Sequence, residues 1–271
     1  MTELRGAHVL ITGAASGLGR RMALGIAQRG GKTLSLWDVN LEGLDAVAEE
    51  VERSGAGARP VVCDVSDRSA VYTAAKRITE PVDILINNAG VVSGKSLLDI
   101  PDEQIRKSLE VNIHSLFWMI KAFLPAMIER NRGHIVTIAS AAGLIGVPRL
   151  TDYCATKFAA VGLDESLRVE LKKRAPGMRT TVVCPYYIDT GMFEGVKTRF
   201  SFLLPILTEE NAVHKILRAI ERNRPQLHMP LLVHSIPLLR LLPTSWFDAI
   251  ARFMGISASM DEFVGRKPDS T

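Results

Sequence analysis

The sequence predicts an α/β protein built on a doubly wound, Rossmann-like parallel sheet. Short runs of β-branched and aliphatic residues recur along the chain, separated by longer stretches with helical spacing. Most of these runs are apolar throughout rather than alternating, which is typical of parallel strands covered by helices on both faces. The six predicted strands are Ala7–Thr12, Thr33–Trp37, Arg59–Cys63, Val82–Ile86, His134–Ala139 and Thr180–Cys184.

Length and composition agree with a soluble globular protein. The chain has 271 residues, of which 47% are hydrophobic and 23% are charged, so it is long enough to bury a core as a single domain. Its net charge of +4 is spread along the chain, and the densest basic cluster is Lys172-Lys173-Arg174. No basic face is interleaved with aromatic residues, so nucleic acid is excluded as an expected partner.

Cysteine usage and hydropathy indicate a reduced cytoplasmic location. Cys63, Cys154 and Cys184 lack CxxC spacing, and no cluster of ligands suggests a metal site. No uncharged stretch reaches the length of a bilayer span. The first strand begins within a few residues of Met1, so we expect no anchor or targeting segment ahead of the fold.

A glycine-rich turn between the first strand and a helix predicted at Arg20–Gln28 indicates a nucleotide site. It reads Thr12-Gly13-Ala14-Ala15-Ser16-Gly17-Leu18-Gly19, with GxxxGxG spacing. Glycines let the backbone turn sharply and approach a pyrophosphate, whose charge is met by the free amides of the helix. Glycines also simply end strands, so the turn alone is a weak signal. The next helix is predicted over Leu41–Ser54, with an apolar face that ends before Gly55.

Two carboxylates follow later strands. Asp38 comes directly after the second strand, where it can accept hydrogen bonds from the adenosine ribose and would repel a 2′-phosphate. Together with uncharged Ser16 it favours NAD over NADP. Arg20 is the nearest cation, and we interpret it as a solvated residue of the first helical turn. Asp64 could receive the adenine amino group or cap the next helix.

Tyr153 and Lys157 lie four residues apart in a helical stretch and project from one face. An ammonium a few ångströms from a phenol favours the phenolate and makes it a usable acid or base. Ser140 ends the fifth strand, at the edge of a parallel sheet where ligands bind, so its hydroxyl could hold a substrate oxygen beside Tyr153. Cys154 points about 100° away from Tyr153 and is expected to be a packed thiol.

The chain carries, in this order, TGAASGLG, Asp64, Asn87-Asn88-Ala89-Gly90, Asn112, Ser140 and Tyr153-xxx-Lys157. Over residues 6 to about 192 this set of motifs resembles the short-chain dehydrogenase/reductase superfamily. The resemblance implies that Tyr153 exchanges the hydroxyl proton, Lys157 binds the nicotinamide ribose and lowers the Tyr153 pKa, Ser140 positions the substrate oxygen and Asn112 holds a water. The expected cofactor contacts are Gly13, Ser16, Gly17, Leu18, Gly19, Asp38, Asp64, Val65, Asn88, Ala89, Gly90, Tyr153, Lys157, Pro185, Ile188 and Thr190, with Asn88 and Gly90 partly structural.

The segment after the sixth strand departs from the family pattern. Where the family has Pro-Gly, this chain has Pro185-Tyr186, although Ile188 and Thr190 still fall at the expected carboxamide contacts. Tyr186 could add aromatic surface to the pocket or fill the core. The stretch Cys184–Pro205 resembles the branch of retinol dehydrogenases and lipid-droplet 17β-hydroxysteroid dehydrogenases, whose members often carry an N-terminal membrane segment that we do not find here.

The composition changes after about Thr190, where the strand and helix rhythm gives way to helices and an apolar, proline-broken tail. We therefore divide the chain into a dinucleotide-binding and catalytic domain (1–224) and an apolar extension (225–271). The tail over Pro225–Met260 carries only Arg240, Asp248 and Arg252 as charges. It could pack in the core or at a subunit interface of a homodimer or homotetramer, or it could form a hydrophobic substrate mouth that contacts a membrane peripherally.

These features predict an NAD-dependent oxidoreductase that transfers a hydride between the cofactor and a bulky apolar alcohol or carbonyl of retinoid, steroid or long-chain type. An NADP-dependent carbonyl reductase is the alternative enzyme. A non-catalytic nucleotide-sensing protein is the alternative of another class, and the joint presence of Asn112, Ser140, Tyr153 and Lys157 argues against it.

Overall fold

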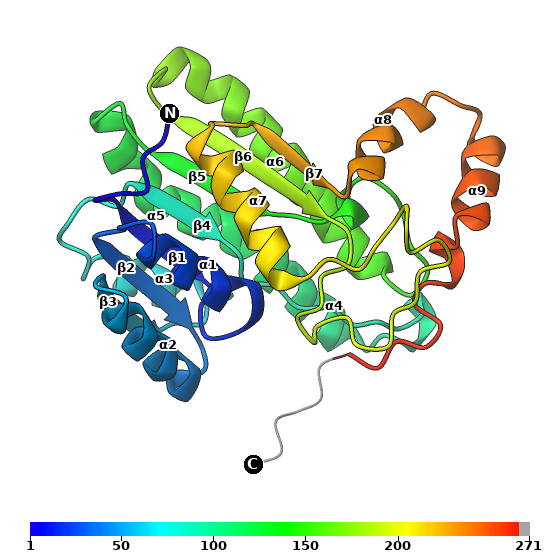
Figure 1. Cartoon of the computed structure of the whole chain (residues 1–271), viewed down its shortest axis with the longest axis horizontal. Coiled ribbons are helices and arrows are strands. Elements are labelled where there is room, and N and C mark those ends of the chain that lie inside the picture. The colour runs from blue at the N-terminus through cyan, green and yellow to red at the C-terminus, as the bar shows by residue number, and fades with distance from the viewer. Residues whose placement is uncertain (266–271) are drawn as a thin grey trace.

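A computed structural model describes residues 1–265 and has a seven-stranded sheet whose paired strands are all parallel (Figure 1). The spatial order is β3-β2-β1-β4-β5-β6-β7, which is the predicted doubly wound arrangement. The last six residues of the predicted extension lie outside the described residues. The strands are β1 (His8–Thr12), β2 (Thr33–Asp38), β3 (Gly57–Val62), β4 (Ile84–Asn87), β5 (His134–Ile138), β6 (Arg179–Pro185) and β7 (Gln226–Met229).

All six predicted strands are present, but the seventh strand was not predicted. β7 pairs in parallel with β6, from Val182 opposite Gln226 to Pro185 opposite Met229. It has four residues, of which Gln226 and His228 are polar, so it lacks the apolar run that identifies the other strands. The prediction that only helices and a proline-broken tail follow Thr190 is therefore wrong at residues 226–229, where the sheet gains a further strand.

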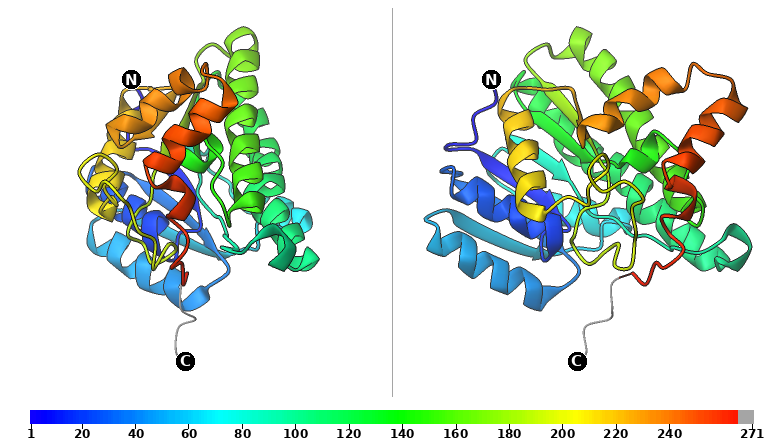
Figure 2. Two further views of the ribbon diagram at one scale, coloured as in Figure 1. Left: turned by 90° about the vertical axis from the view of Figure 1, so that its right-hand side faces the viewer. Right: turned by 45° about the vertical axis from the view of Figure 1, so that its right-hand side comes forward.

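Helices cover both faces of the sheet, as the apolar strands predicted (Figure 2). Along β1, Val9 and Ile11 belong to one apolar core and Leu10 to the other, because successive side chains of a strand point to opposite faces. One core is covered by α1 (Gly17–Ala27), α2 (Leu41–Arg53) and α7 (Glu209–Glu221), and the other by α3 (Arg68–Ala75), α5 (Ser115–Glu129) and α6 (Thr151–Arg174).

Local capping sets several helix starts. The side chain of Asn40 accepts a hydrogen bond from Gly43 N and begins α2 at the predicted residue. Asp67 caps α3 through Ser69 N and Ala70 N, and Thr208 caps α7. The first helix begins at Gly17 rather than Arg20, so its amino end lies inside the glycine-rich turn.

The chain after β7 forms short helices beyond the β7 edge of the sheet (Figure 1). They pack on a small apolar cluster that includes Ile145, Leu204 and Ile256. Five of their large apolar side chains, Leu231, Leu238, Leu241, Trp246 and Phe253, are between 61% and 83% exposed. The helices are η4 (Leu231–Ser235), α8 (Ile236–Leu239), α9 (Thr244–Phe253) and η5 (Ile256–Ala258).

One helical run in the described part of the chain, Asp102–Glu129, has the length and apolar character to cross a membrane. It consists of α4 (Asp102–Leu109), a π-helical turn η2 (Glu110–His114) and α5. Half of its most apolar window is buried, and α5 contributes side chains such as Met119 and Phe123 to the core beneath the sheet. Burial against the sheet therefore accounts for its apolar composition.

We expect His134 to make the protein less stable in acid. It is buried at the start of β5, where Nε2 lies 2.8 Å from Thr181 Oγ1 and Nδ1 lies 2.9 Å from Thr2 Oγ1. Burial lowers the pKa of His134 to about 3 from its usual 6.5. Because the unfolded chain binds the proton first, the free energy of unfolding should fall by ~1.4 kcal/mol per pH unit below pH 6.5 from this residue.

Urea unfolding between pH 7.5 and pH 5 measures this effect. His134→Asn should flatten the decline, whereas the same change at exposed His214 should leave it as in the wild type. A His134→Asn variant with the wild-type slope would refute the assignment.

Candidate active site

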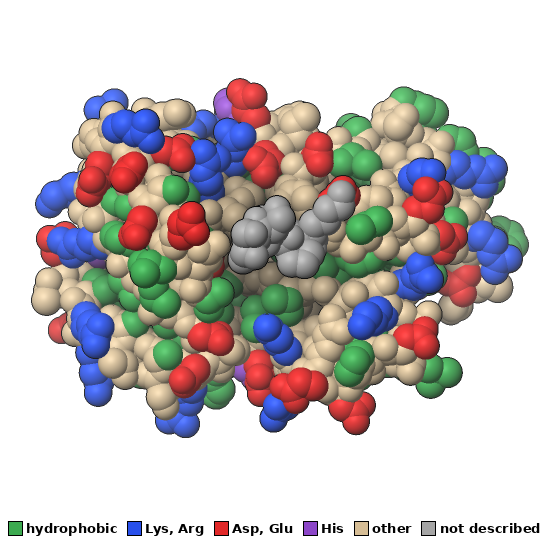
Figure 3. All heavy atoms as spheres, turned by 90° about the horizontal axis from the view of Figure 1, so that it is seen from below, with side chains coloured by type: hydrophobic (Ala, Val, Ile, Leu, Met, Phe, Trp, Pro, Cys, Tyr) green, Lys and Arg blue, Asp and Glu red, His purple; other side chains and the backbone are tan. Residues whose placement is uncertain are grey.

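A cleft runs along the carboxyl ends of the strands and gathers most of the predicted site residues. Figure 3 shows the lower face of the molecule, where apolar side chains gather near a central hollow and charges of both signs are interspersed around it. In parallel sheets ligands bind at this edge, where neighbouring loops leave to opposite faces. The predicted residues that line the cleft are Gly13, Ser16, Gly17, Leu18, Asp38, Asp64, Val65, Asn88, Ala89, Gly90, Ser140, Tyr153, Lys157, Pro185, Ile188 and Thr190.

The glycine-rich turn has the geometry of an anion cradle. Gly13 and Gly17 have φ values of +66° and +50°, which favour glycine. A Cβ at Gly13 would overlap Asn88 and Ala89, and Asn88 Nδ2 donates to the carbonyls of Thr12 and Gly13 at 3.0 Å. The amino end of α1 is not capped by the side chain of its N-cap residue, Ser16, and helix amino ends are favourable sites for a pyrophosphate. The residues therefore fit a dinucleotide.

Gly19 is not among the residues that line the cleft, and its contact with a cofactor stays a prediction. A Cβ at this position would overlap the carbonyl group of Gly13. Its small size lets α1 pack closely on the turn.

Asp38 is fixed at the far end of the cleft by backbone amides. Its Oδ2 accepts from Ala15 N at 3.0 Å, and its Oδ1 accepts from Val39 N at 2.8 Å and Asn40 N at 3.1 Å. Arg20, expected to be a solvated cation, instead forms a bidentate pair with Glu50 at 2.7 and 2.8 Å. The nearest cation to the turn is therefore paired within the protein.

The hydrogen bonds around Asp64 distinguish between its two predicted roles, as an adenine contact and as a helix cap. Its Oδ1 accepts from Ser66 N and Ser66 Oγ at 2.9 and 2.6 Å, whereas Asp67 supplies the cap of α3. Capping therefore does not explain Asp64, which lines the cleft beside Val65. Its contact with an adenine amino group stays a prediction.

Tyr153 and Lys157 lie one turn apart on the buried face of α6, as predicted. Lys157 Nζ donates to the carbonyl of Ile138 at 2.9 Å and lies 5.4 Å from the centre of the Tyr153 ring. Ser140 lies two residues after the end of β5 and caps a short turn, η3 (Ala141–Gly143). A Cβ at Gly143 would overlap the Lys157 carbonyl, so glycine allows the close contact that brings Ser140 to Tyr153.

Burial sets the protonation of this pair. It raises the pKa of the Tyr153 phenol, while a hydrogen bond with Ser140 acts in the opposite direction. Burial also lowers the pKa of Lys157 to about 8, which leaves the ammonium mostly charged at neutral pH. In the protein alone the phenol therefore keeps its proton, and the lowering of its pKa by Lys157 remains a prediction for the cofactor-bound enzyme.

Asn112 lies in the π-helical turn η2, a feature often found at functional sites. Its Oδ1 accepts from Val91 N at 2.8 Å, and its Nδ2 donates to Val91 O at 2.9 Å and Thr156 Oγ1 at 3.2 Å. It does not line the cleft itself but fastens the chain after Gly90 to α6. Its role in holding a water stays a prediction.

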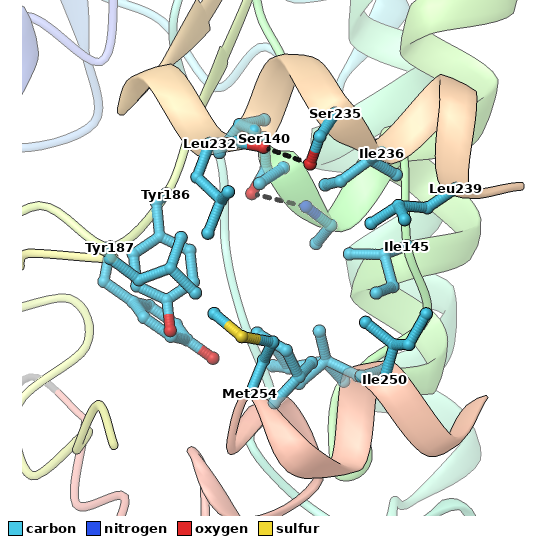
Figure 4. Close-up of a pocket in the computed structure, with 18 of the residues that line it drawn as sticks. Ser140, Ile145, Tyr186, Tyr187, Leu232, Ser235, Ile236, Leu239, Ile250 and Met254 are labelled. Atoms are coloured by element: carbon cyan, nitrogen blue, oxygen red, sulfur yellow. Dashed lines mark hydrogen bonds between the residues drawn. The ribbon is translucent and has the colours of Figure 1, made fainter. Parts of the chain in front are cut away.

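A narrow apolar cavity adjoins the cleft at Ser140 and Tyr153 (Figure 4). The segment η4–α8 and helix α9 form two of its walls, with Ile145 and the Tyr186-Tyr187 pair between them. Tyr186 and Phe193 also line both spaces. Tyr186 therefore contributes aromatic surface to the pocket and also packs against two of the buried apolar clusters.

Hydroxyl groups in this cavity are mostly engaged within the protein. Tyr187 Oη lies 2.9 Å from Ser259 Oγ, Tyr186 is hydrogen bonded to Thr198, and Ser235 Oγ donates to Leu232 O at 2.7 Å. No charged side chain of the described residues lines the cavity. Ser140 Oγ accepts from Ala142 N at 3.1 Å and donates to Pro185 O at 3.5 Å, and it lies with Tyr153 at the boundary with the cleft, where a substrate oxygen would meet both hydroxyls.

Several residues that line the cleft were not predicted from the sequence. Lys107 and Val111 reach the cleft from α4 and η2, and Met192 and Phe193 reach it from the segment after β6. These residues come from irregular segments or helix faces that carry no motif. Another missed feature is the buried carboxylate of Asp152, which precedes Tyr153 and accepts from two serine hydroxyls, at 2.7 Å each.

Comparison with known proteins agrees with this geometry. The family profile described as short chain dehydrogenase matches residues 7–199. The chain is 48% identical to epidermal retinol dehydrogenase 2 of Mus musculus, covering 98% of this chain and 87% of that protein, and 41% identical to retinol dehydrogenase 10-B of Danio rerio, covering 99% and 88%. A short chain dehydrogenase/reductase from Burkholderia phymatum in complex with NAD superposes with a TM-score of 0.80 at 28% identity, covering 89% of this chain and 95% of that one.

Removing the Tyr153 hydroxyl should abolish proton transfer while leaving the cleft intact. Tyr153→Phe should lower turnover by about 10²- to 10⁴-fold, the range for general acid–base catalysis, with NADH binding close to wild type. Steady-state rates and NADH fluorescence titration measure the two effects. Tyr72→Phe removes a hydroxyl on α3 outside the cleft and cavity and should change neither, and a Tyr153→Phe variant with normal turnover would contradict the role.

Proposed function

The chain belongs to the short chain dehydrogenase family of oxidoreductases, and from that premise we propose that it is an NAD-dependent dehydrogenase of bulky apolar alcohols of retinoid type. The relatives named retinol dehydrogenase, matched over nearly the whole chain, support this substrate class. Steroid and long-chain alcohols are the other bulky apolar substrates to be compared with retinoid alcohols.

The observation that carries the proposal is the apolar cavity, which no charged side chain of the described residues lines and which meets the cleft at the hydroxyls of Ser140 and Tyr153. An apolar substrate with one terminal hydroxyl satisfies such a site, because every additional polar group would be buried without a partner. A sugar or hydroxy acid would leave several groups unpaired. The site is therefore suited to a long hydrocarbon that ends in an alcohol or a carbonyl.

The reaction follows from the positions of these groups. Ser140 would hold the substrate oxygen and Tyr153 would take the hydroxyl proton, while bound NAD supplies the hydride acceptor at the nicotinamide ring. The Lys157 ammonium, 5.4 Å from the phenol ring centre, favours the phenolate that oxidation requires. In the opposite direction the protonated Tyr153 donates its proton to the carbonyl oxygen.

The preference for NAD rests on Asp38. Its carboxylate is held by three backbone amides at the end of the cleft, so it cannot easily turn away from a 2′-phosphate. Arg20, which could otherwise neutralise that phosphate, is paired with Glu50. Both features support NAD, whereas a carbonyl reductase that prefers NADP is the alternative.

A substrate panel with both cofactors tests this function. Rates with all-trans-retinol, a secondary steroid alcohol, a long-chain alcohol and butan-1-ol should be measured with NAD and with NADP in parallel. We expect kcat/KM to be highest for retinol with NAD and to be lower with NADP by about two decades, from repulsion at Asp38. A preference for NADP or for butan-1-ol would overturn the proposal, and no turnover with any of them would favour a nucleotide-sensing protein.

Asp38→Ala provides the matched variant. It should reduce the difference in kcat/KM between NAD and NADP without changing the order of the alcohols by kcat/KM. Asp45→Ala, in α2 outside the cleft, should leave the difference in kcat/KM between NAD and NADP unchanged.

Peripheral contact with a membrane from the cytoplasmic side is the second part of the proposal. The exposed side chains of Leu231, Leu238, Trp246 and Phe253 lie on the short helices that also wall the cavity, and exposed Leu241 lies in the turn between α8 and α9, so an apolar substrate could pass from lipid to the site. These helices are short and broken by prolines, so they can lie in an interface but cannot span it. Assembly into a homodimer or homotetramer through the same face is the competing proposal.

Liposome sedimentation separates these two proposals. The wild type should co-sediment with neutral phosphatidylcholine vesicles, and Trp246→Ser should weaken sedimentation and raise KM for retinol while leaving NAD binding unchanged. Leu98→Ser, at an apolar residue that is even more exposed (98% against 65% for Trp246) but does not line the cavity, should change neither sedimentation nor KM. If Trp246→Ser instead dissociates an oligomer at unchanged KM, this face is a subunit interface.

A further inference from the structure

The last described residues of the chain return to the active site. This C-terminal strap (residues 259–265) runs beside the Phe193 loop (residues 190–199), which has no regular helix or strand. Lys197 N donates to Ser259 O at 3.2 Å, and Val264 N donates to Glu194 O at 2.9 Å. The strap is therefore hydrogen bonded to the loop at two places five residues apart on its own chain.

Side chains add to these backbone contacts. Tyr187 Oη lies 2.9 Å from Ser259 Oγ, and Lys197 Nζ lies 2.6 Å from the Glu262 carboxylate. Arg149, just before α6, donates to the carbonyls of Met260 and Asp261 at 3.1 and 3.0 Å. The strap thus joins the Phe193 loop to the start of the helix that carries Tyr153.

Phe263 lies at the centre of this contact. Its ring packs against Gly94, where a Cβ would overlap it, and its centroid is 6.4 Å from that of Phe193. The Phe193 ring in turn lies edge-on to Tyr153, with a centroid distance of 5.8 Å. Phe263 lines neither the cleft nor the cavity, so any influence on substrate passes through Phe193.

We propose that Phe263 is a positioning residue that holds Phe193 against Tyr153 and so shapes the wall shared by the cofactor cleft and the apolar cavity. The loop has no regular helix or strand, and to its internal bonds from Glu194 N to Gly191 O and from Val196 N to Phe193 O the strap adds backbone bonds at Glu194 and Lys197. The effect on catalysis rests on the proposed function, whereas the effect on the loop does not.

Kinetics and proteolysis together test this role. Phe263→Ala should raise KM for retinol about ten-fold, with KM for NAD and the rate with butan-1-ol nearly unchanged, because a short alcohol does not extend along the Phe193 wall. Trypsin should cleave after Lys197 and Arg199, both in the Phe193 loop, about ten-fold faster than in the wild type. Phe263→Leu, which keeps an apolar side chain of intermediate size, should recover part of both effects and serves as the test if the alanine variant does not fold.

Val264→Ala is the matched control, since its side chain is 64% exposed and its backbone bond to Glu194 is kept. It should match the wild type in every measurement. Unchanged cleavage and unchanged KM in both Phe263 variants would overturn the proposal, as would an equal rise in KM for retinol and butan-1-ol. Faster cleavage in a protein that oxidises none of the alcohols would support the strap and refute the proposed function.

Discussion

The parallel alignment of the strands is the constraint on which the rest of the molecule depends. Because all seven run the same way, the residues that follow them collect at one edge, although they are far apart in the sequence. Asp38 at the end of β2, Asn88 after β4 and Ser140 after β5 are brought together in this way. The arrangement also requires helices on both faces, and one of them, α6, carries Tyr153 and Lys157 to the same edge.

Features with a local cause could be predicted from the sequence. The apolar strands, the glycine turn and the one-turn spacing of Tyr153 and Lys157 each depend on residues within a short window, and the structure contains all three. Asp38 was predictable because it follows a strand directly. The depth of burial around Tyr153 was not predictable, and it raises the pKa of the phenol in the protein without cofactor.

Features that depend on partners distant in the chain could not be predicted. β7 is recognised by its pairing with β6 and not by its own residues, and Arg20 is neutralised by Glu50, thirty residues away. Gly19 carries the spacing of a cofactor contact but is required by its fit against Gly13. The role of Phe263 is invisible in sequence because its partners, Gly94 and Phe193, share no motif with it.

The π-helical turn at Glu110–His114 has a consequence for which changes this chain can tolerate. Ser108, before the turn, is hydrogen bonded to Asp152, and Asn112, within the turn, is hydrogen bonded to Thr156. The two partners are thus four residues apart on each of the two helical segments. Deleting one residue would restore a regular helix but rotate one of these partners by about 100°. Substitutions at exposed His114 leave both pairs intact, so this stretch is far more permissive of changes in residue type than of changes in length.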